Sequence, residues 1–248
     1  MEFITLAIIF FASIVAGMYG ALVGGPALVT IPLLIFLGIS PIVSIATNRV
    51  GLIGVATAGW YKFHIKGKID YRIGWILAIP AIIGSYFGAN IVLNIEDIIL
   101  KRIIAIFTLA LLAFLIFKPS LGLKTQNKKL FTRHYLIGGV LSFFVGVYGG
   151  FYGAGMGTFM IYILILLFGQ SFIQGAATNK ISLVLLGLMA ATVFIFNKVV
   201  LFEFAAVIFI GSFIGGYISS HYAEKIGNRY IKWLFVLVVG IMALKLLF

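Results

Sequence analysis

Two basic residues stand inside apolar sequence, and each follows the same tripeptide. Arg49 and Lys180 both come directly after Ala-Thr-Asn, and they lie 131 positions apart. A charged side chain at the centre of a bilayer costs roughly 2.5–3.5 kcal/mol on insertion scales, so intramembrane charges usually mark functional sites. Because both charges are positive and occupy matching places, the pattern predicts a site for an anion.

The residues around the two cations add hydrogen-bond donors. Arginine offers a planar fork that suits an oxyanion, and lysine offers a compact point charge. The preceding Asn and Thr side chains add amide and hydroxyl donors. No acidic residue lies deep in an apolar segment to pair with Arg49 or Lys180. The substrate class predicted from these side chains is a small anion.

A second interpretation is that both cations extend their aliphatic stems to the lipid headgroups. Each lies about five residues inside its predicted segment, or roughly 7 Å at 1.5 Å per residue. The doubled tripeptide favours a binding site over this snorkelling. If the two segments begin near the bilayer midplane, their helix N-termini also favour anions.

Glycine clusters interrupt the apolar sequence ahead of each cation. Gly24, Gly25 and Pro26 stand where the first apolar segment ends, and glycines alternate with other residues from 153 to 157. Such clusters break helices and let backbone approach a ligand. Close helix packing is the alternative, and it is preferred for Gly146, Gly150, Gly211 and Gly215. The full set predicted to bind substrate is Thr47, Asn48, Arg49, Thr178, Asn179, Lys180, Gly24, Gly25, Gly153 and Gly155.

The composition is that of an integral membrane protein. Of 248 residues, 63% are hydrophobic and 10% are charged, whereas soluble domains are near half apolar and a quarter charged. Basic residues outnumber acidic ones 18 to 6, but they lie between apolar spans, which argues against nucleic-acid binding. The chain has no cysteine, and its three histidines lack metal-site spacing, so no metal and no cofactor are predicted. No nucleophile–base pair or paired carboxylates suggest an enzyme.

Apolar segments divide the chain into two similar halves. The predicted domains are a first transmembrane repeat (1–117), a basic cytoplasmic linker (118–134) and a second transmembrane repeat (135–248). Predicted segments in the first half are 4–24, 27–37, 44–61, 73–93 and 98–117, and in the second half 136–150, 158–168, 175–196, 199–221 and 228–248. A bilayer crossing needs about 20 apolar residues. The second segment of each half is too short, so it forms a hairpin or broken helix with the first.

Loop charges indicate how the halves are oriented. Lysine and arginine collect in cytoplasmic loops, which places residues 62–72 and the linker in the cytoplasm. The counterpart of 62–72 in the second half is a nearly neutral turn at 197–198, whereas 225–232 is basic. The fold class predicted is therefore an all-α integral membrane protein with inverted repeats, as in transporters that bind substrate near the midplane. A parallel arrangement requires each hairpin to count as one crossing, for which residues 4–37 are too long.

The order of these motifs resembles the sulfite exporter TauE/SafE family over nearly the whole chain. It rests on a glycine-rich break, then Ile31-Pro32-Leu33, Gly38 and the tripeptide before Arg49, with a second copy running from Gly153 to Lys180. The resemblance implies a multi-pass permease of the cell (inner) membrane for sulfite, a sulfonate or a related organosulfur anion. It also implies that the Thr, Asn and cationic residues of both copies bind that anion.

Two other functions remain open from the residues alone. One is a passive anion channel, and the other is a membrane assembly or anchoring protein that moves no solute. The partners expected are a small anionic substrate and the lipid bilayer, without nucleic acid, and a homodimer is left open.

Overall fold

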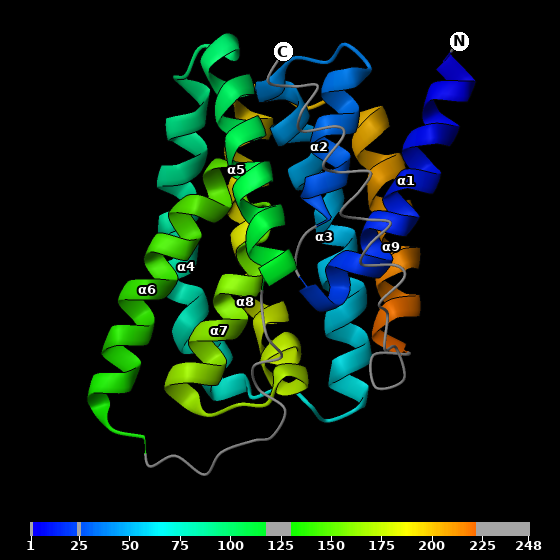
Figure 1. Cartoon of the computed structure of the whole chain (residues 1–248). Coiled ribbons are helices and arrows are strands. Elements are labelled where there is room, and N and C mark those ends of the chain that lie inside the picture. Colours follow the sequence, from blue (N-terminus) through cyan, green and yellow to red (C-terminus); the bar gives the residue numbers. More distant parts are fainter. Residues whose placement is uncertain (1, 24–25, 118–129, 222–248) are drawn as a thin grey trace.

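The computed structural model describes residues 2–23, 26–117 and 130–221, and within them every regular element is an α-helix (Figure 1). The helices are α1 (Glu2–Val23), α2 (Ala27–Phe36), α3 (Pro41–Ile65), α4 (Tyr71–Leu93), α5 (Asp97–Phe117), α6 (Thr132–Phe151), α7 (Met156–Phe168), α8 (Phe172–Phe196) and α9 (Phe202–His221). The predicted all-α fold class is confirmed. The last predicted segment, 228–248, and most of the predicted linker lie outside the described residues.

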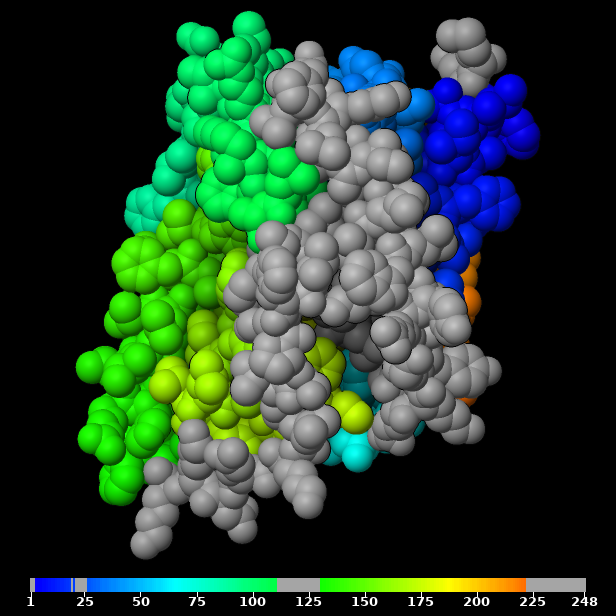
Figure 2. Space-filling view, in the orientation of Figure 1, coloured from blue at the N-terminus to red at the C-terminus, as the bar shows by residue number. Residues whose placement is uncertain are grey.

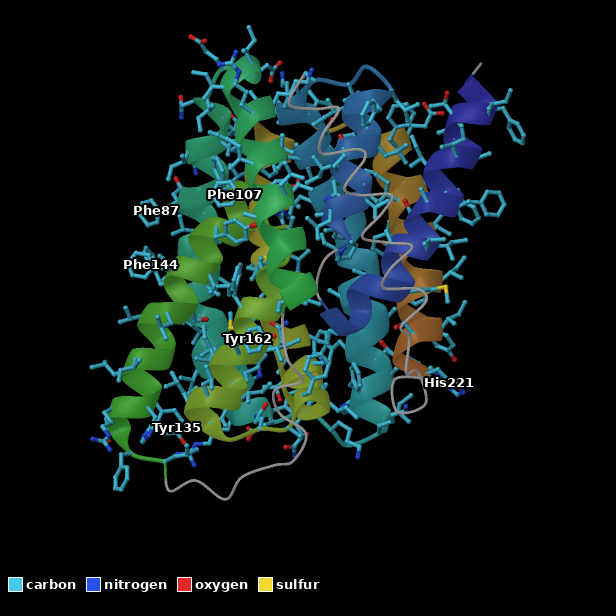
Figure 3. The ribbon with its side chains drawn as sticks, in the orientation of Figure 1. Phe87, Phe107, Tyr135, Phe144, Tyr162 and His221 are labelled. Atoms are coloured by element: carbon cyan, nitrogen blue, oxygen red, sulfur yellow. The ribbon has the colours of Figure 1, made fainter. Side chains whose placement is uncertain are left out.

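Helix lengths match a multi-pass membrane protein. Among the described residues, α3, α4, α6, α8 and α9 are long and apolar enough to cross a bilayer. Helices α2 and α7 have only 10 and 13 residues, which confirms one short segment in each half. Large apolar side chains cover the outside, including Phe144 at 62% exposed and Phe196 at 82% exposed. Figure 3 shows Phe87 and Phe144 pointing away from the helices, as side chains in contact with lipid would.

Polar caps determine where the two central helices, α3 and α8, begin. The Ser40 side chain accepts a hydrogen bond from the backbone N–H of Val43 (3.5 Å), and Pro41 takes the first helical position. Ser171 and Gln174 form a reciprocal capping box at the start of α8. Both helices have 25 residues and begin three residues earlier than predicted. Helix α3 runs through the molecule from end to end (Figure 1), so it begins at one end of the molecule and not at its middle.

Two helix pairs fold back inside the molecule. Figure 1 shows α1 and α6 starting at opposite ends of the molecule. Helix α2 runs back toward the end where α1 starts, and α7 runs back toward the end where α6 starts. In the space-filling view, α6 and α1 form opposite flanks (Figure 2). Helix α3 packs against α8, while α4 packs along α6 and α8, and α9 along α1 and α3. The helix after each central helix thus packs on the first helix of the other half.

Glycines bring these helix pairs close together. Gly84 of α4 lies against the backbone of Phe143 in α6, and Gly215 of α9 lies against the backbone of Ile14 in α1. A side chain at either position would meet backbone that has no freedom to rotate away. All the glycines predicted to serve packing lie against the backbone of a neighbouring helix, which confirms that prediction: Gly146, Gly150, Gly211 and Gly215.

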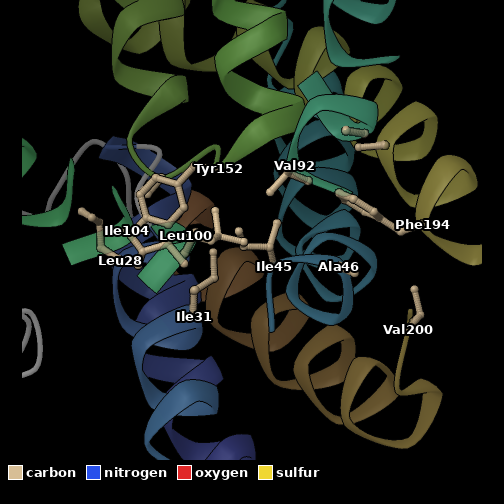
Figure 4. Close-up of a cluster of buried hydrophobic side chains, with 14 of the residues drawn as sticks. Leu28, Ile31, Ile45, Ala46, Val92, Leu100, Ile104, Tyr152, Phe194 and Val200 are labelled. Atoms are coloured by element: carbon tan, nitrogen blue, oxygen red, sulfur yellow. The ribbon is translucent and has the colours of Figure 1, made fainter. Parts of the chain in front are cut away.

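The largest buried apolar cluster surrounds the first turns of α3 (Figure 4). Ile31 of α2, Ile45 of α3, Ile104 of α5 and Tyr152 after α6 are all fully buried within it. A second cluster joins α4, α6, α7 and α8. Dense packing of this kind leaves side chains little freedom. The polar residues of α3 that follow Ile45 are therefore held in place by apolar neighbours from other helices.

Candidate functional site

Arg49 and Lys180 line the same small cavity. Their side chains are only 1% and 2% exposed. The cavity has a volume of about 30 Å³, room for about two water molecules. Each cation lies eight residues past the first residue of its helix (41 to 49 and 172 to 180), or about 12 Å along the axis. They are deeper than predicted, and their burial contradicts the snorkelling interpretation.

Matching faces of the two central helices form most of the cavity wall. It consists of Leu52, Ile53, Val55 and Ala56 from α3, Leu183 and Gly187 from α8, and Gly20, Pro26, Gly153 and Met156 beside the breaks. Sequence reasoning did not single out the apolar residues of α3 and α8. Most of them lie three, four or seven positions after a cation, which is the spacing of one helix face. That spacing is the signal that could have found them.

The Arg49 side chain reaches from α3 to the break between α6 and α7. Its Nη2 donates hydrogen bonds to the backbone carbonyls of Gly149 and Tyr152, the second over 3.1 Å. Gly153 makes room for the guanidinium, since a Cβ there would collide with both Nη atoms. Both of these partners are backbone carbonyls, so among the described residues the hydrogen bonds to this positive charge come from dipoles and not from a carboxylate. The Nε of Arg49 is buried and has no hydrogen-bond partner among the described residues.

The α6–α7 break brings a helix N-terminus to the cavity. Gly153 and Gly155 have φ of +75° and +71°, a conformation that glycine adopts readily and other residues avoid. Helix α7 begins directly afterwards at Met156, which lines the cavity, as does Pro26 ahead of α2. Helix N-termini favour anions. The N-termini at the cavity therefore belong to α2 and α7, and the prediction that they would be those of α3 and α8 is corrected.

Three other glycines were predicted to bind substrate, and none of them is seen to line the cavity. Gly155 is the N-cap of α7 but does not itself line the cavity. Gly24 and Gly25 lie outside the described residues.

Thr47 and Thr178 stand away from the cavity wall and contact other helices. The Oγ1 of Thr47 accepts a hydrogen bond from the backbone N–H of Leu201, directly before α9, over 3.0 Å. The Oγ1 of Thr178 accepts one from the backbone N–H of Asp70, directly before α4, over 3.1 Å. Both hydroxyls thus connect a central helix to the start of a helix from the other half.

Asn48 and Asn179 lie beside the short helices. Thr30 of α2 donates its hydroxyl hydrogen to the Oδ1 of Asn48, and the Nδ2 of Asn179 donates to the carbonyl of Gly157 in α7 over 3.2 Å. The Nδ2 of Asn48 is buried without a hydrogen-bond partner among the described residues. Such an unmet donor costs about 1–3 kcal/mol. An acceptor atom on a ligand close to Asn48 would remove that cost.

The described residues contain no group of three His, Asp or Glu side chains that could hold a metal ion. The polar chemistry at the cavity is instead that of two buried cations and two helix N-termini, while Asn48 and Asn179 do not themselves line it. The model of the sulfite exporter TauE/SafE family matches residues 9–246. The chain belongs to the sulfite exporter TauE/SafE family. The resemblance predicted from the motifs is confirmed.

Relatives of this TauE/SafE protein are named as transporters. The chain is 28% identical over 243 residues to a "Probable membrane transporter protein" of Haemophilus influenzae, covering 98% of this chain and 94% of the relative. It is 27% identical over 248 residues to "Probable membrane transporter protein ORF9" of Sinorhizobium, covering 100% and 94%. It is 24% identical over 243 residues to "Probable membrane transporter protein YfcA" of Escherichia coli, covering 98% and 90%. No solved structure matches the chain.

Family and fold together make this TauE/SafE protein a multi-pass membrane transporter. The names of the family and of its relatives indicate a transporter rather than an enzyme.

Proposed function

We propose that this protein is a cell-membrane permease for a small sulfur-containing anion, such as sulfite, a sulfonate or a related organosulfur compound. The observation that carries the proposal is that Arg49 and Lys180, both almost fully buried, line one cavity. Positive charges that line one cavity repel each other, and an anion bound between them lowers that cost. An anionic substrate supplies that negative charge.

The donors around the cavity suit an oxyanion. A sulfite or sulfonate group presents several acceptor oxygens, and an arginine fork binds such groups through two parallel hydrogen bonds. The Nε of Arg49 and the Nδ2 of Asn48 are buried donors without described partners. The family description names sulfite, whereas the relatives' names state no substrate. These observations support a sulfur oxyanion as the substrate class.

We infer that residues 1–117 and 135–248 are inverted copies arranged around this cavity, joined by the linker 118–134. The two hairpins, α1–α2 and α6–α7, enter from opposite ends of the molecule, which supports inversion (Figure 1). Inverted repeats with a central site allow one half to rock against the other, so that the site opens to each side in turn. This arrangement favours a carrier over an open channel.

The proposal also orients the protein in the cell membrane. The α3–α4 connection lies at one end of the molecule, and Figure 3 shows Tyr135, near the start of α6, and His221 at that same end. The basic residues of these segments are Lys62, Lys66, Lys68, Arg72 and Arg133. Since lysine and arginine collect on the cytoplasmic side, we assign this end to the cytoplasm.

Flux measurements in proteoliposomes test the proposal. Radiolabelled sulfite and a short sulfonate should enter protein-containing vesicles with saturation and counterflow. Arg49→Ala and Lys180→Ala should each lower this flux by roughly tenfold or more, because each removes a charged hydrogen-bond donor worth about 1.5–3 kcal/mol. Arg102→Ala, which removes an exposed arginine at the start of α5, is the matched control and should transport normally.

Three results would contradict this function. Normal flux in both cavity variants would remove the assigned site. Flux without saturation or counterflow would indicate a passive channel. No flux of any sulfur anion by folded protein would favour an assembly or anchoring role.

A further inference from the structure

Arg49 acts as a cap for α6 that comes from another helix. Its Nη2 donates to the carbonyls of Gly149 and Tyr152, in and directly after the last turn of α6. The last carbonyls of a helix have no donor within it, and a cation at this end complements the helix dipole. Arg49 lies in the first half of the chain and α6 in the second. One side chain therefore connects the two halves where α6 ends.

Other side chains also hold the residues that follow α6. The hydroxyl of Tyr148 donates to the carbonyl of Ala154 over 2.6 Å. The Tyr152 hydroxyl forms a 2.6 Å hydrogen bond with Thr108 of α5. Asn179 of α8 donates to the carbonyl of Gly157. Of these side chains, only that of Arg49 also lines the cavity.

The guanidinium of Arg49 has donors for two sets of acceptors, of which the structure shows one. It has five N–H donors in a rigid plane. Nη2 bonds the two carbonyls of α6, while Nε is buried without a described partner. A bond from a guanidinium to an anion adds the attraction between two full charges, which a neutral backbone carbonyl does not offer. An anion in the cavity would therefore draw the guanidinium toward itself and weaken its hold on α6.

We propose that Arg49 is a positioning residue for the α6–α7 break as well as a ligand for the anion, so that anion binding and the position of the break are coupled through one guanidinium. The identity of the anion rests on the proposed function, whereas the contact with α6 does not. Coupling is reciprocal, so moving the break also changes anion affinity. This gives the anion a direct means of changing the conformation of the second half.

Lys180 is not equivalent to Arg49 in this role. Lysine carries a point charge and lacks the planar fork that can bond two acceptor groups at fixed angles. The stem of Lys180 packs against Gly59 of α3, with its Cε 2.7 Å from where a Cβ would stand. The position of the break thus depends on the arginine of the pair.

Thiol labelling at the break tests the coupling. The chain has no cysteine, so Ala154→Cys introduces one thiol at a fully buried position. Labelling by a maleimide should be slow in this parent and faster when methanesulfonate is added. Arg49→Lys keeps the charge but loses the fork. It should raise labelling without any anion by roughly fivefold or more, the lower end of typical coupling, and methanesulfonate should add little further.

The matched control removes a similar cap elsewhere. Lys66 donates to the carbonyls of Ser220 and His221 at the end of α9, so Lys66→Gln should leave labelling of Ala154→Cys unchanged. If Arg49→Lys does not fold, Gly153→Ala is the second variant. Its added methyl group would collide with the Nη atoms of Arg49 and displace the guanidinium, so labelling without anion should rise as it does for Arg49→Lys.

The two proposals fail in different ways. Slow labelling in folded Arg49→Lys, or parent labelling that bound methanesulfonate does not change, would overturn the coupling and leave the proposed function standing. If methanesulfonate neither shifts the melting temperature of the parent nor crosses the vesicle membrane, the anion function and the coupling to it fail together, even if Arg49→Lys still labels faster.

Discussion

The Oγ1 of Thr178 in α8 accepts a hydrogen bond from the backbone N–H of Asp70, over 3.1 Å. Thr47 in α3 accepts the corresponding bond from Leu201 over 3.0 Å, and both members of the pair are displaced by 131 positions (47 to 178 and 70 to 201). Reciprocal contacts of this kind are what the proposed inverted repeats would form about a twofold axis. These bonds connect α3 to the start of α9, and α8 to the start of α4.

Replacing either threonine by valine should destabilise the protein without changing its anion affinity. Thr47→Val and Thr178→Val keep the side-chain shape but leave a backbone N–H without its acceptor, at a cost of about 1–3 kcal/mol. Thermal unfolding in detergent should show similar decreases for both. Thr57→Val is the control, since among the described residues the Thr57 hydroxyl bonds carbonyls of its own helix. Lost anion binding at normal stability would instead make the threonines ligands.

Gly84→Ala and Gly215→Ala should lower stability by similar amounts. Each added methyl group meets the backbone of a neighbouring helix, which side-chain rotation cannot move aside. Overpacking of this kind typically costs about 1–3 kcal/mol. Gly139→Ala should be nearly neutral, because its nearest neighbour is a Pro80 side-chain atom at 3.6 Å. Equal melting temperatures for all three variants in detergent would contradict this account of the helix contacts.

Gly153→Ala should be more harmful than Gly67→Ala. Both glycines have positive φ, +75° and +60°, so each variant carries backbone strain of about 1–3 kcal/mol. Only at Gly153 does the methyl group also collide with the guanidinium of Arg49, since Gly67 has open space. The difference in melting temperature between the two variants would measure the cost of the collision with Arg49. Arg49→Ala in the same background should add less than it does alone, because the two residues share one contact.

Gly59→Ala should change transport more than stability. The added methyl group would meet the Cε of Lys180, and a flexible side chain can move away at little cost. The ammonium group would then shift within the cavity. The concentration of sulfite that gives half-maximal flux should rise by roughly tenfold, or about 1.4 kcal/mol, while the melting temperature stays near that of the parent. An unchanged flux curve would show that the position of Lys180 does not matter.

Local composition was enough to predict the helices and the pair of cations. Length and apolarity determine whether a segment can cross a bilayer, and clusters of glycine and proline interrupt helices whatever their neighbours are. Segment length, apolarity and glycine clusters are properties of short stretches of chain. For that reason the short helices α2 and α7 and the glycine break before Met156 could be predicted from the sequence. The starts of α3 and α8 were missed by three residues because Ser40 and Ser171 add a polar cap ahead of the apolar run.

By itself the sequence determined that two cations stand in matching places within two similar halves. Only the tertiary structure decided what each side chain near them contacts. Arg49 meets carbonyls about 100 positions away, and the threonines bond the starts of distant helices rather than the cavity. Such partners depend on how helices cross, and helix crossings come from packing spread over the whole chain rather than from any short motif.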